Sequence, residues 1–170
     1  MERVKGMQRK SIIVFAVGAA AIVSLAIPQP PKPGALVWNF TGSVPLGLYS
    51  IGTRAWRRDD RVAVKPEGRL AEILQSSGVL KEGRLLLKRV AAASGDEVCR
   101  TGDRIAINGL AVGLAQRDEA LPVWSGCLRL NHNEVFFLGE TQNSFDGRYF
   151  GVTSAREIVG PVDPILVFER

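Results

Sequence analysis

Few side chains in this 170-residue chain can serve as a nucleophile or as a base. Its one histidine, His132, lies in a polar Asn-His-Asn segment with no carboxylate in a clear orienting position, so a Ser-His-Asp triad is not expected. The chain has no HExxH motif, no cluster of cysteine and histidine ligands and no GxxxxGK[ST] loop. We therefore expect neither a metal nor a nucleotide cofactor. A serine activated by a lysine remains as the arrangement for a hydrolase.

Lys88 is the lysine whose neighbours would lower its pKa. A lysine acts as a general base only when it is neutral near pH 7, and burial among apolar side chains favours the neutral form. Of the six lysines, only Lys88 lies inside an apolar run, which extends from Leu85 to Val90. On a strand, Leu86, Lys88 and Val90 would share one face. The alternative is an edge-strand lysine that prevents aggregation.

Ser43 is the candidate nucleophile because its neighbours restrict the backbone. Gly42, Pro45 and Gly47 surround it and predict a tight path that another segment can approach closely. The alternative is an ordinary serine in a turn.

The segments that must position these residues predict mainly β structure. Arg104–Val112 contains two alternating apolar runs around Asn108-Gly109, a dipeptide suited to a type I′ hairpin turn. Further predicted strands are Leu85–Val90, Glu134–Leu138 and Ile165–Phe168.

A short helix is predicted over Arg69–Gln75. Leu70, Ile73 and Leu74 fall on one helical face, and Gly78 provides a stop. The fold class is therefore a small, mainly β domain with short helices.

The N-terminus predicts a membrane anchor. Residues 11–27 carry no charge and are long enough, at 17 residues, for a short spanning helix. The basic tail, residues 1–10, stays in the cytoplasm by the positive-inside rule, so everything after Ile27 is exported. The proline-rich residues 28–37 then form a stiff spacer before a domain over residues 38–170.

A cleaved signal peptide is the alternative to a retained anchor. Ser24 and Ala26 form a small-x-small pair, as at a cleavage site, but the apolar stretch is longer than the usual core of such peptides. Ser43 follows Ile27 by 16 residues, close enough to act on a substrate anchored in the same bilayer.

The net charge of +5 does not indicate a nucleic-acid partner. Residues 1–10 carry +3 of it, and the other 160 residues carry only +2. The arginines between positions 54 and 61 are interrupted by Asp59 and Asp60, as in a solvated loop. A nucleic-acid binder needs a basic face on its folded part.

The two cysteines, Cys99 and Cys127, are compatible with one disulfide in an exported domain. Two unrelated buried thiols are the alternative.

Three segments, in this order, resemble the sequence boxes of the type I signal peptidases, the serine–lysine peptidases of family S26. SVPLGLY (Ser43–Tyr49) resembles their nucleophile box, and LLLKRVAAASGDEV (Leu85–Val98) resembles their lysine box. LGETQNSFDGRYFG (Leu138–Gly151) resembles their third box. The short interval from Ser43 to Lys88 and the two cysteines are also similar to the TraF peptidases of conjugative plasmid transfer.

The resemblance implies a role for each matching residue. Ser43 would form the acyl-enzyme, and Lys88 would be its general base. The backbone N–H of Ser43 would form part of the oxyanion hole, to which Thr41 would add a hydroxyl. Ser144 would orient the lysine.

The third box also implies support for the site and shows two departures. Asp146 and Arg148 match a charged pair that supports the site. Gly147 stands where the family usually has serine, and residues 140–142 replace the usual polar residues.

The implied function is hydrolysis of a peptide bond without metal or cofactor. The implied enzyme sits in the inner membrane with a single pass and a periplasmic catalytic domain, and the bilayer and a membrane-inserted pilin precursor are its partners. In some TraF relatives the same enzyme joins the pilin ends into a ring. The alternatives are a general signal peptidase and a non-catalytic anchored β-domain of a pilus or export assembly.

Overall fold

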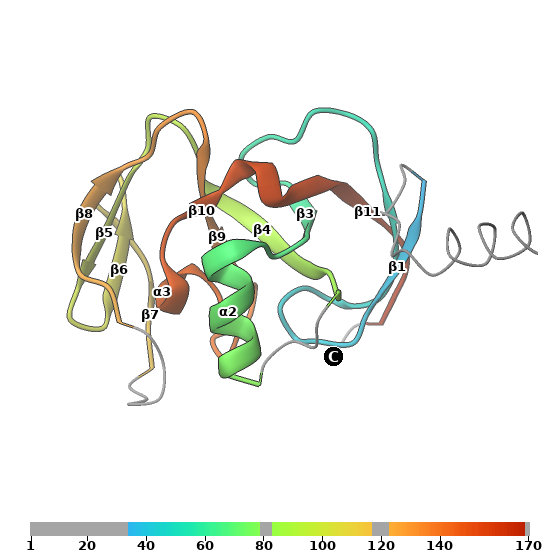
Figure 1. Ribbon diagram of the computed structural model, residues 1–170, viewed down its shortest axis with the longest axis horizontal. Coiled ribbons are helices and arrows are strands. Elements are labelled where there is room, and N and C mark those ends of the chain that lie inside the picture. Colours follow the sequence, from blue (N-terminus) through green and yellow to red (C-terminus); the bar gives the residue numbers. More distant parts are fainter. Residues whose placement is uncertain (1–33, 79–82, 117–122, 169–170) are drawn as a thin grey trace, which may run out of the picture. The chain divides into compact units, whose positions relative to one another are not determined.

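The computed structural model describes residues 34–78, 83–116 and 123–168 (Figure 1). The chain divides into two units, 1–30 and 31–170, and the described residues all belong to the second. The predicted tail and membrane anchor, residues 1–27, lie outside the described residues. Within the described ranges, no helix is long and apolar enough to cross a bilayer.

Two antiparallel sheets hold most of the regular secondary structure in the described residues, which confirms the mainly β fold class. The larger has seven strands in the order β1-β2-β11-β3-β4-β9-β10. Their bounds are β1 Leu36–Asn39, β2 Leu46–Ile51, β3 Arg61–Val64, β4 Leu86–Ala92, β9 Glu134–Leu138, β10 Thr153–Ser154 and β11 Ile158–Phe168. The smaller has the order β7-β6-β5-β8. Its strands are β5 Glu97–Thr101, β6 Arg104–Ile107, β7 Leu110–Leu114 and β8 Gly126–Arg129.

The helices are short, as expected. Helix α2 (Gly68–Ser76) covers the predicted segment and buries Leu70 and Leu74. These two leucines belong to a core cluster with residues of β3, β4 and β9. Helix α3 (Gly147–Phe150) and the 3₁₀ turn η1 (Ala155–Glu157) lie in the connection from β9 to β11.

The predicted hairpin is confirmed. Strands β6 and β7 flank Asn108 and Gly109, whose φ angles are 50° and 78°. Both angles are positive, as a type I′ turn requires.

Strand β11 is longer than its predicted segment, Ile165–Phe168, because it begins at Ile158. Pro161 and Pro164 interrupt the apolar pattern from which a strand is recognised. The strand accommodates them because it changes partner, pairing first with β3 and then with β2, with a register shift after Pro164. Strand β1 begins at Leu36, inside the predicted spacer.

The alternation predicted for the lysine strand is reproduced in β4. Leu86 and Val90 join a core cluster with Phe137 under α2, whereas Leu87 joins a second cluster with Tyr49. Both faces of β4 are therefore buried, and Lys88 is only 2% exposed. Lys88 pairs with Val62 on β3 and so is not an edge-strand lysine.

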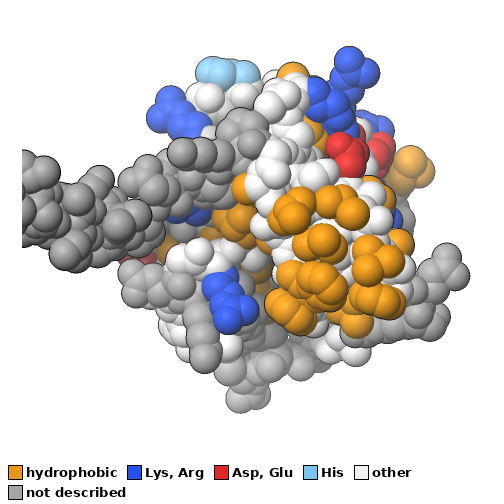
Figure 2. Space-filling model, turned by 90° about the vertical axis from the view of Figure 1, so that its right-hand side faces the viewer, with side chains coloured by type: hydrophobic (Ala, Val, Ile, Leu, Met, Phe, Trp, Pro, Cys, Tyr) orange, Lys and Arg blue, Asp and Glu red, His pale blue; other side chains and the backbone are white. Residues whose placement is uncertain are grey.

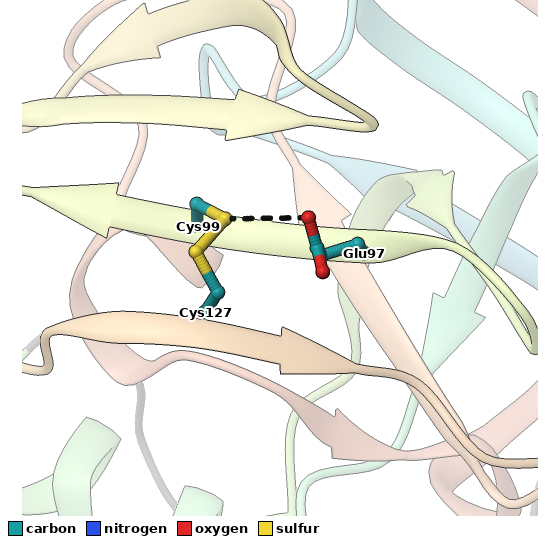
Figure 3. Close-up of side chains that lie close together, drawn as sticks. All are labelled: Glu97, Cys99 and Cys127. Atoms are coloured by element: carbon teal, nitrogen blue, oxygen red, sulfur yellow. Dashed lines mark hydrogen bonds between the residues drawn. A yellow bond between two sulfur atoms is a disulfide. The ribbon is translucent and has the colours of Figure 1, made fainter.

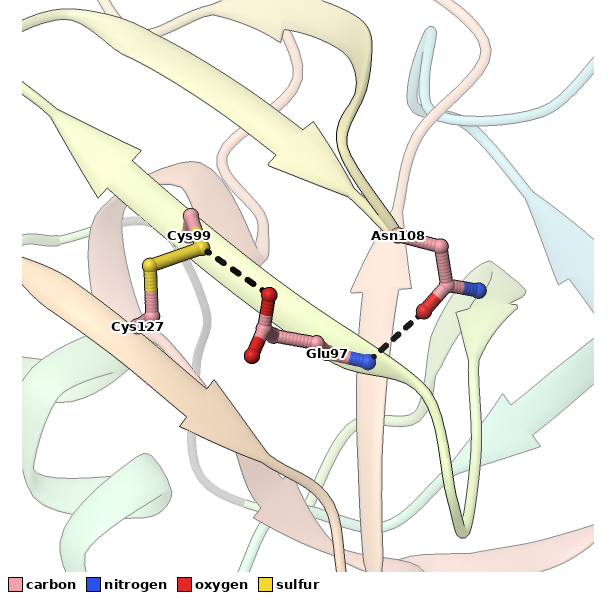
Figure 4. Close-up of a disulfide and its surroundings, with 4 residues drawn as sticks. All are labelled: Glu97, Cys99, Asn108 and Cys127. Atoms are coloured by element: carbon pink, nitrogen blue, oxygen red, sulfur yellow. Dashed lines mark hydrogen bonds between the residues drawn. A yellow bond between two sulfur atoms is a disulfide. The ribbon is translucent and has the colours of Figure 1, made fainter.

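Cys99 on β5 and Cys127 on β8 are directly opposite in the register of the small sheet and are joined by a disulfide (Figure 3). Two residues before Cys99 on β5, Glu97 N donates to Asn108 Oδ1 at 2.9 Å (Figure 4). This bond ties β5 to the turn of the β6–β7 hairpin. The disulfide therefore crosslinks two strands through cysteines that are 28 residues apart in sequence.

Candidate active site

The loop between β1 and β2 carries Ser43. Gly47, the second residue of β2, has a φ of 147°, and a Cβ there would lie 2.0 Å from Leu166 O on β11. This glycine allows the close approach that the sequence predicted. Ser43 O accepts a hydrogen bond from Glu140 N at 2.6 Å, which joins the loop to the segment that follows β9.

Lys88 reaches from the centre of the large sheet to two hydroxyls. Its Nζ lies 2.7 Å from Ser43 Oγ and 2.7 Å from Ser144 Oγ. Burial lowers the pKa of Lys88 from 10.5 to about 8; the negative charge of Asp146 opposes this shift and the positive charge of Arg148 adds to it. Near pH 7 the neutral form is therefore still the minor form, but it is far more populated than in a lysine with the usual pKa.

Ser144 completes a triangle with the other two residues. Its hydroxyl donates to Ser43 Oγ at 3.2 Å. A Cβ at Gly139 would lie 2.0 Å from Ser144 Oγ and 2.3 Å from its Cβ. Ser144 thus fits only because position 139 has no side chain, a requirement that was not recognised from the sequence.

Asp146 and Arg148 form a buried ion pair beside Ser144. The Arg148 guanidinium donates to Asp146 through Nε at 2.8 Å and through Nη2 at 2.8 Å. Nη2 also donates to Thr141 O and Ser144 O. Asp146 in turn accepts from Gly139 N at 2.7 Å. The pair therefore ties together the backbone on both sides of Ser144.

The departure from the family pattern at Gly147 has a steric reason. A Cβ at this position would lie 2.6 Å from the Phe136 ring and 2.7 Å from Phe137 O. Asp146 and Arg148 retain their contacts without the serine that the family usually has there.

Thr41 lies beside Ser43 in the chain, but its hydroxyl has another partner in this structure. Thr41 Oγ1 donates to Asn39 Oδ1 at 2.9 Å. To donate to an oxyanion, the hydroxyl would have to give up this bond. Asn39 was not singled out from the sequence; the available signal is that an asparagine at the end of a strand bonds to nearby backbone groups.

A cleft of about 420 Å³ lies next to Ser43. Its apolar lining comes from Val44, Pro45, Leu46 and Phe168. Glu140 also lines it, and an ion pair with Arg61 at 2.6 Å holds that carboxylate.

The remaining charged residues that the sequence singled out lie elsewhere. Arg54 pairs with Asp60, and Arg58 pairs with Asp96. The arginine cluster is thus balanced by carboxylates, as expected of a solvated loop. His132 is exposed and lies 3.0 Å from the Asn133 amide.

Comparison with known proteins identifies the family to which this chain belongs. The family model described as signal peptidase, peptidase S26, matches residues 6–167. The chain therefore belongs to the S26 signal peptidase family and is a signal-peptidase-type protease.

Two relatives point to one branch of this family. The chain is 30% and 28% identical to two Escherichia coli proteins called plasmid transfer protein TraF, over 145 residues that cover 76% of this chain and 82% of each relative. A crystal structure of a signal peptidase I from Enterococcus faecalis is 20% identical, with a TM-score of 0.39, and covers 64% of this chain and 97% of that chain.

Proposed function

We propose that this chain is a serine endopeptidase in which Ser43 forms an acyl-enzyme and Lys88 is the general base. The observation that carries the proposal is the setting of Lys88. Its side chain is buried, its pKa is lowered to about 8, and its Nζ lies 2.7 Å from Ser43 Oγ. A neutral amine at this distance can take the hydroxyl proton as the oxygen attacks a carbonyl carbon.

The reaction then follows from the geometry. Lys88 Nζ removes the proton of Ser43 as Oγ bonds to the carbonyl carbon of the scissile peptide. The backbone N–H of Ser43, which donates to no other described residue, stabilises the resulting oxyanion. The ammonium of Lys88 protonates the leaving nitrogen, the C–N bond breaks, and an ester remains on Ser43. A water deprotonated by Lys88 hydrolyses this ester.

Ser144 acts by orienting the base. A neutral amine has a single lone pair, and a hydrogen bond to Ser144 Oγ leaves that lone pair free to face Ser43. The buried pair of Asp146 and Arg148 holds Ser144 in place through its backbone.

An apolar face beside the cleft supports the proposal that the domain lies against a lipid bilayer. The register places Trp38, Leu48 and Leu166 side by side across β1, β2 and β11. The exposed apolar residues on β1 and β11 and directly after β1 are Leu36, Trp38, Phe40, Ile165, Leu166, Val167 and Phe168. Figure 2 shows hydrophobic side chains gathered on one face. Phe168 also lines the cleft, so a substrate anchored in the membrane would reach Ser43 directly.

We further propose that the domain is held on the periplasmic side of the inner membrane by residues 11–27, and that its substrate is a membrane-inserted pilin precursor. The similarity to plasmid transfer proteins supports a role in conjugative transfer. A general signal peptidase is the second candidate, supported by the family description. A non-catalytic β-domain would not explain why a lysine is buried between two serines.

Processing of the pilin precursor in cells tests the proposal. Cells would carry the wild type, Ser43→Ala or Lys88→Ala, with Ser125→Ala and Lys65→Ala as controls at exposed positions. We expect both site variants to lose processing at normal abundance and both controls to retain it. An intact mass one water below the cleaved product would show that the amino terminus of the product resolves the ester. Normal processing by either site variant would contradict the serine–lysine mechanism.

A further inference from the structure

The Asn39 side chain bonds to both sides of the nucleophile loop. Its Nδ2 lies 2.8 Å from Thr41 O, 3.0 Å from Val44 O and 3.1 Å from Pro45 O. Its Oδ1 accepts from Thr41 N at 3.1 Å and from Thr41 Oγ1 at 2.9 Å. Ser43 lies between these two anchor points.

The orientation of this amide is unambiguous. Three carbonyl oxygens surround one end of the Asn39 side chain, and carbonyls only accept hydrogen bonds, so this end must be the NH₂ group. The other end accepts from a backbone N–H and therefore is the oxygen. Asn39 is only 5% exposed, so water competes little for these bonds.

The Asn39 amide also determines in which direction three carbonyl groups of the loop point. The carbonyls of Thr41, Val44 and Pro45 are turned toward Asn39, which holds their negative ends away from the site where an oxyanion would form. The Ser43 N–H, within the described residues, donates to nothing and stays available. Without the hydrogen bonds from Asn39, the loop would be free to turn a carbonyl toward the developing negative charge. Such a carbonyl would raise the barrier to acyl transfer.

We propose that Asn39 is a positioning residue for acyl transfer at Ser43. It holds the loop over residues 40–45 so that Ser43 Oγ remains next to Lys88 while the Ser43 N–H faces the reacting carbonyl. The inference rests on the proposed serine–lysine function. It assigns the effect to the bonds that Asn39 donates to the carbonyls of Thr41, Val44 and Pro45.

Acylation by a penem, a β-lactam-like probe that reacts with live serine nucleophiles, tests this role without knowledge of the natural substrate. The full chain in detergent would be labelled at several penem concentrations, and adduct mass would be followed with time. This separates the probe's binding constant from the rate constant of acylation. The variants are Asn39→Ala and Asn39→Asp.

Each variant removes a different set of the hydrogen bonds that Asn39 makes. Asn39→Ala removes all the bonds, whereas Asn39→Asp, as a carboxylate, retains those accepted from Thr41 but cannot donate to the carbonyls. We expect both Asn39 variants to lower the acylation rate constant by roughly 10- to 100-fold, the scale of a small misplacement of a reacting group. The binding constant should change less than about threefold, because it does not depend on those donated bonds.

Two controls separate this role from general stability. Asn108→Ala removes an asparagine that also bonds to backbone and side chain, in the hairpin turn of the small sheet. It should lower the melting temperature without changing the acylation rate constant. In Asn39→Ala, the pH midpoint of acylation should remain at the wild-type value, because Lys88 sets it.

The outcomes distinguish this inference from the proposed function. Labelling of Ser43→Ala, or no labelling of the wild type, would overturn both. Normal acylation rates in the Asn39 variants, or a change confined to probe binding, would overturn the role of Asn39 alone. If both Asn39 variants are unfolded at the assay temperature, the positioning role is also refuted, because the hydrogen bonds of Asn39 would then be required for folding.

Discussion

Lys88 and Ser144 lie 56 residues apart in sequence, yet Lys88 Nζ and Ser144 Oγ are 2.7 Å apart in the folded protein. The same Nζ is equally close to Ser43 Oγ, so one buried amine lies between two hydroxyls. In the proposed mechanism, Ser144 orients the lysine while Ser43 reacts.

Activity should depend on pH through Lys88. Burial lowers the pKa of this lysine to about 8, and only the neutral form can accept the Ser43 proton. We expect kcat/KM to rise about tenfold per pH unit below pH 8 and to level off above it. Initial rates of precursor cleavage between pH 6 and pH 10 measure this. A profile that is flat over this range would exclude Lys88 as the base, whereas a rise that continues to pH 10 would show that its pKa is not lowered.

Gly139→Ala should displace Ser144 and reduce activity. The added Cβ would lie 2.0 Å from Ser144 Oγ, closer than any real contact, so the serine must move away from Lys88. We expect kcat to fall by about 100-fold, since a displacement near 1 Å has an effect of that order. Gly113→Ala is the matched control, because its added Cβ would meet only an Arg148 carbon at 3.8 Å. Equal activity in the two variants would show that Gly139 does not position Ser144.

Loss of the Cys99–Cys127 disulfide should destabilise the domain. The bond closes a loop with a sequence separation of 28, for which the chain-entropy model gives about 3–4 kcal/mol. Urea unfolding of the Cys99→Ala, Cys127→Ala double variant against the wild type measures the difference. The wild type under reducing conditions should behave like the double variant. Identical midpoints for oxidised wild type and variant would refute the prediction.

Glu157→Gln should stabilise the protein above pH 7. Burial raises the pKa of Glu157 to about 7; a hydrogen bond from Glu67 N opposes this shift and the Glu67 carboxylate adds to it. Between the unfolded value of 4.5 and about pH 7, the native state binds more protons than the unfolded state, so wild-type stability falls as pH rises through this range. The glutamine variant lacks this loss and can still accept from Glu67 N.

Melting temperatures at pH 4.5 and pH 8 test this expectation. The glutamine variant should gain over the wild type only at the higher pH. Glu72→Gln, at an exposed position on α2, should change neither value appreciably. A gain of the same size at both pH values would mean that ionisation of Glu157 is not the cause.

Local patterns were sufficient to predict several elements. The β6–β7 hairpin, the α2 helix and strand β9 were recognised because turn propensity and apolar periodicity act over a few residues. Strand β11 was predicted only in part, because the residues before Ile165 are stabilised by partners distant in sequence. The N-terminal anchor and the periplasmic location remain predictions.

The sequence by itself selected the residues that are proposed to react or to support the reaction. A lysine inside an apolar run, a serine among glycine and proline, and three ordered boxes were enough to select Ser43, Lys88, Ser144, Asp146 and Arg148. The tertiary structure decided how they meet: the distances at Lys88, the space left by Gly139, and the bonds from Asn39 to the loop around Ser43. These features depend on contacts between segments far apart along the chain or on the exact path of a loop. Such contacts leave no periodicity in the sequence from which they could be predicted.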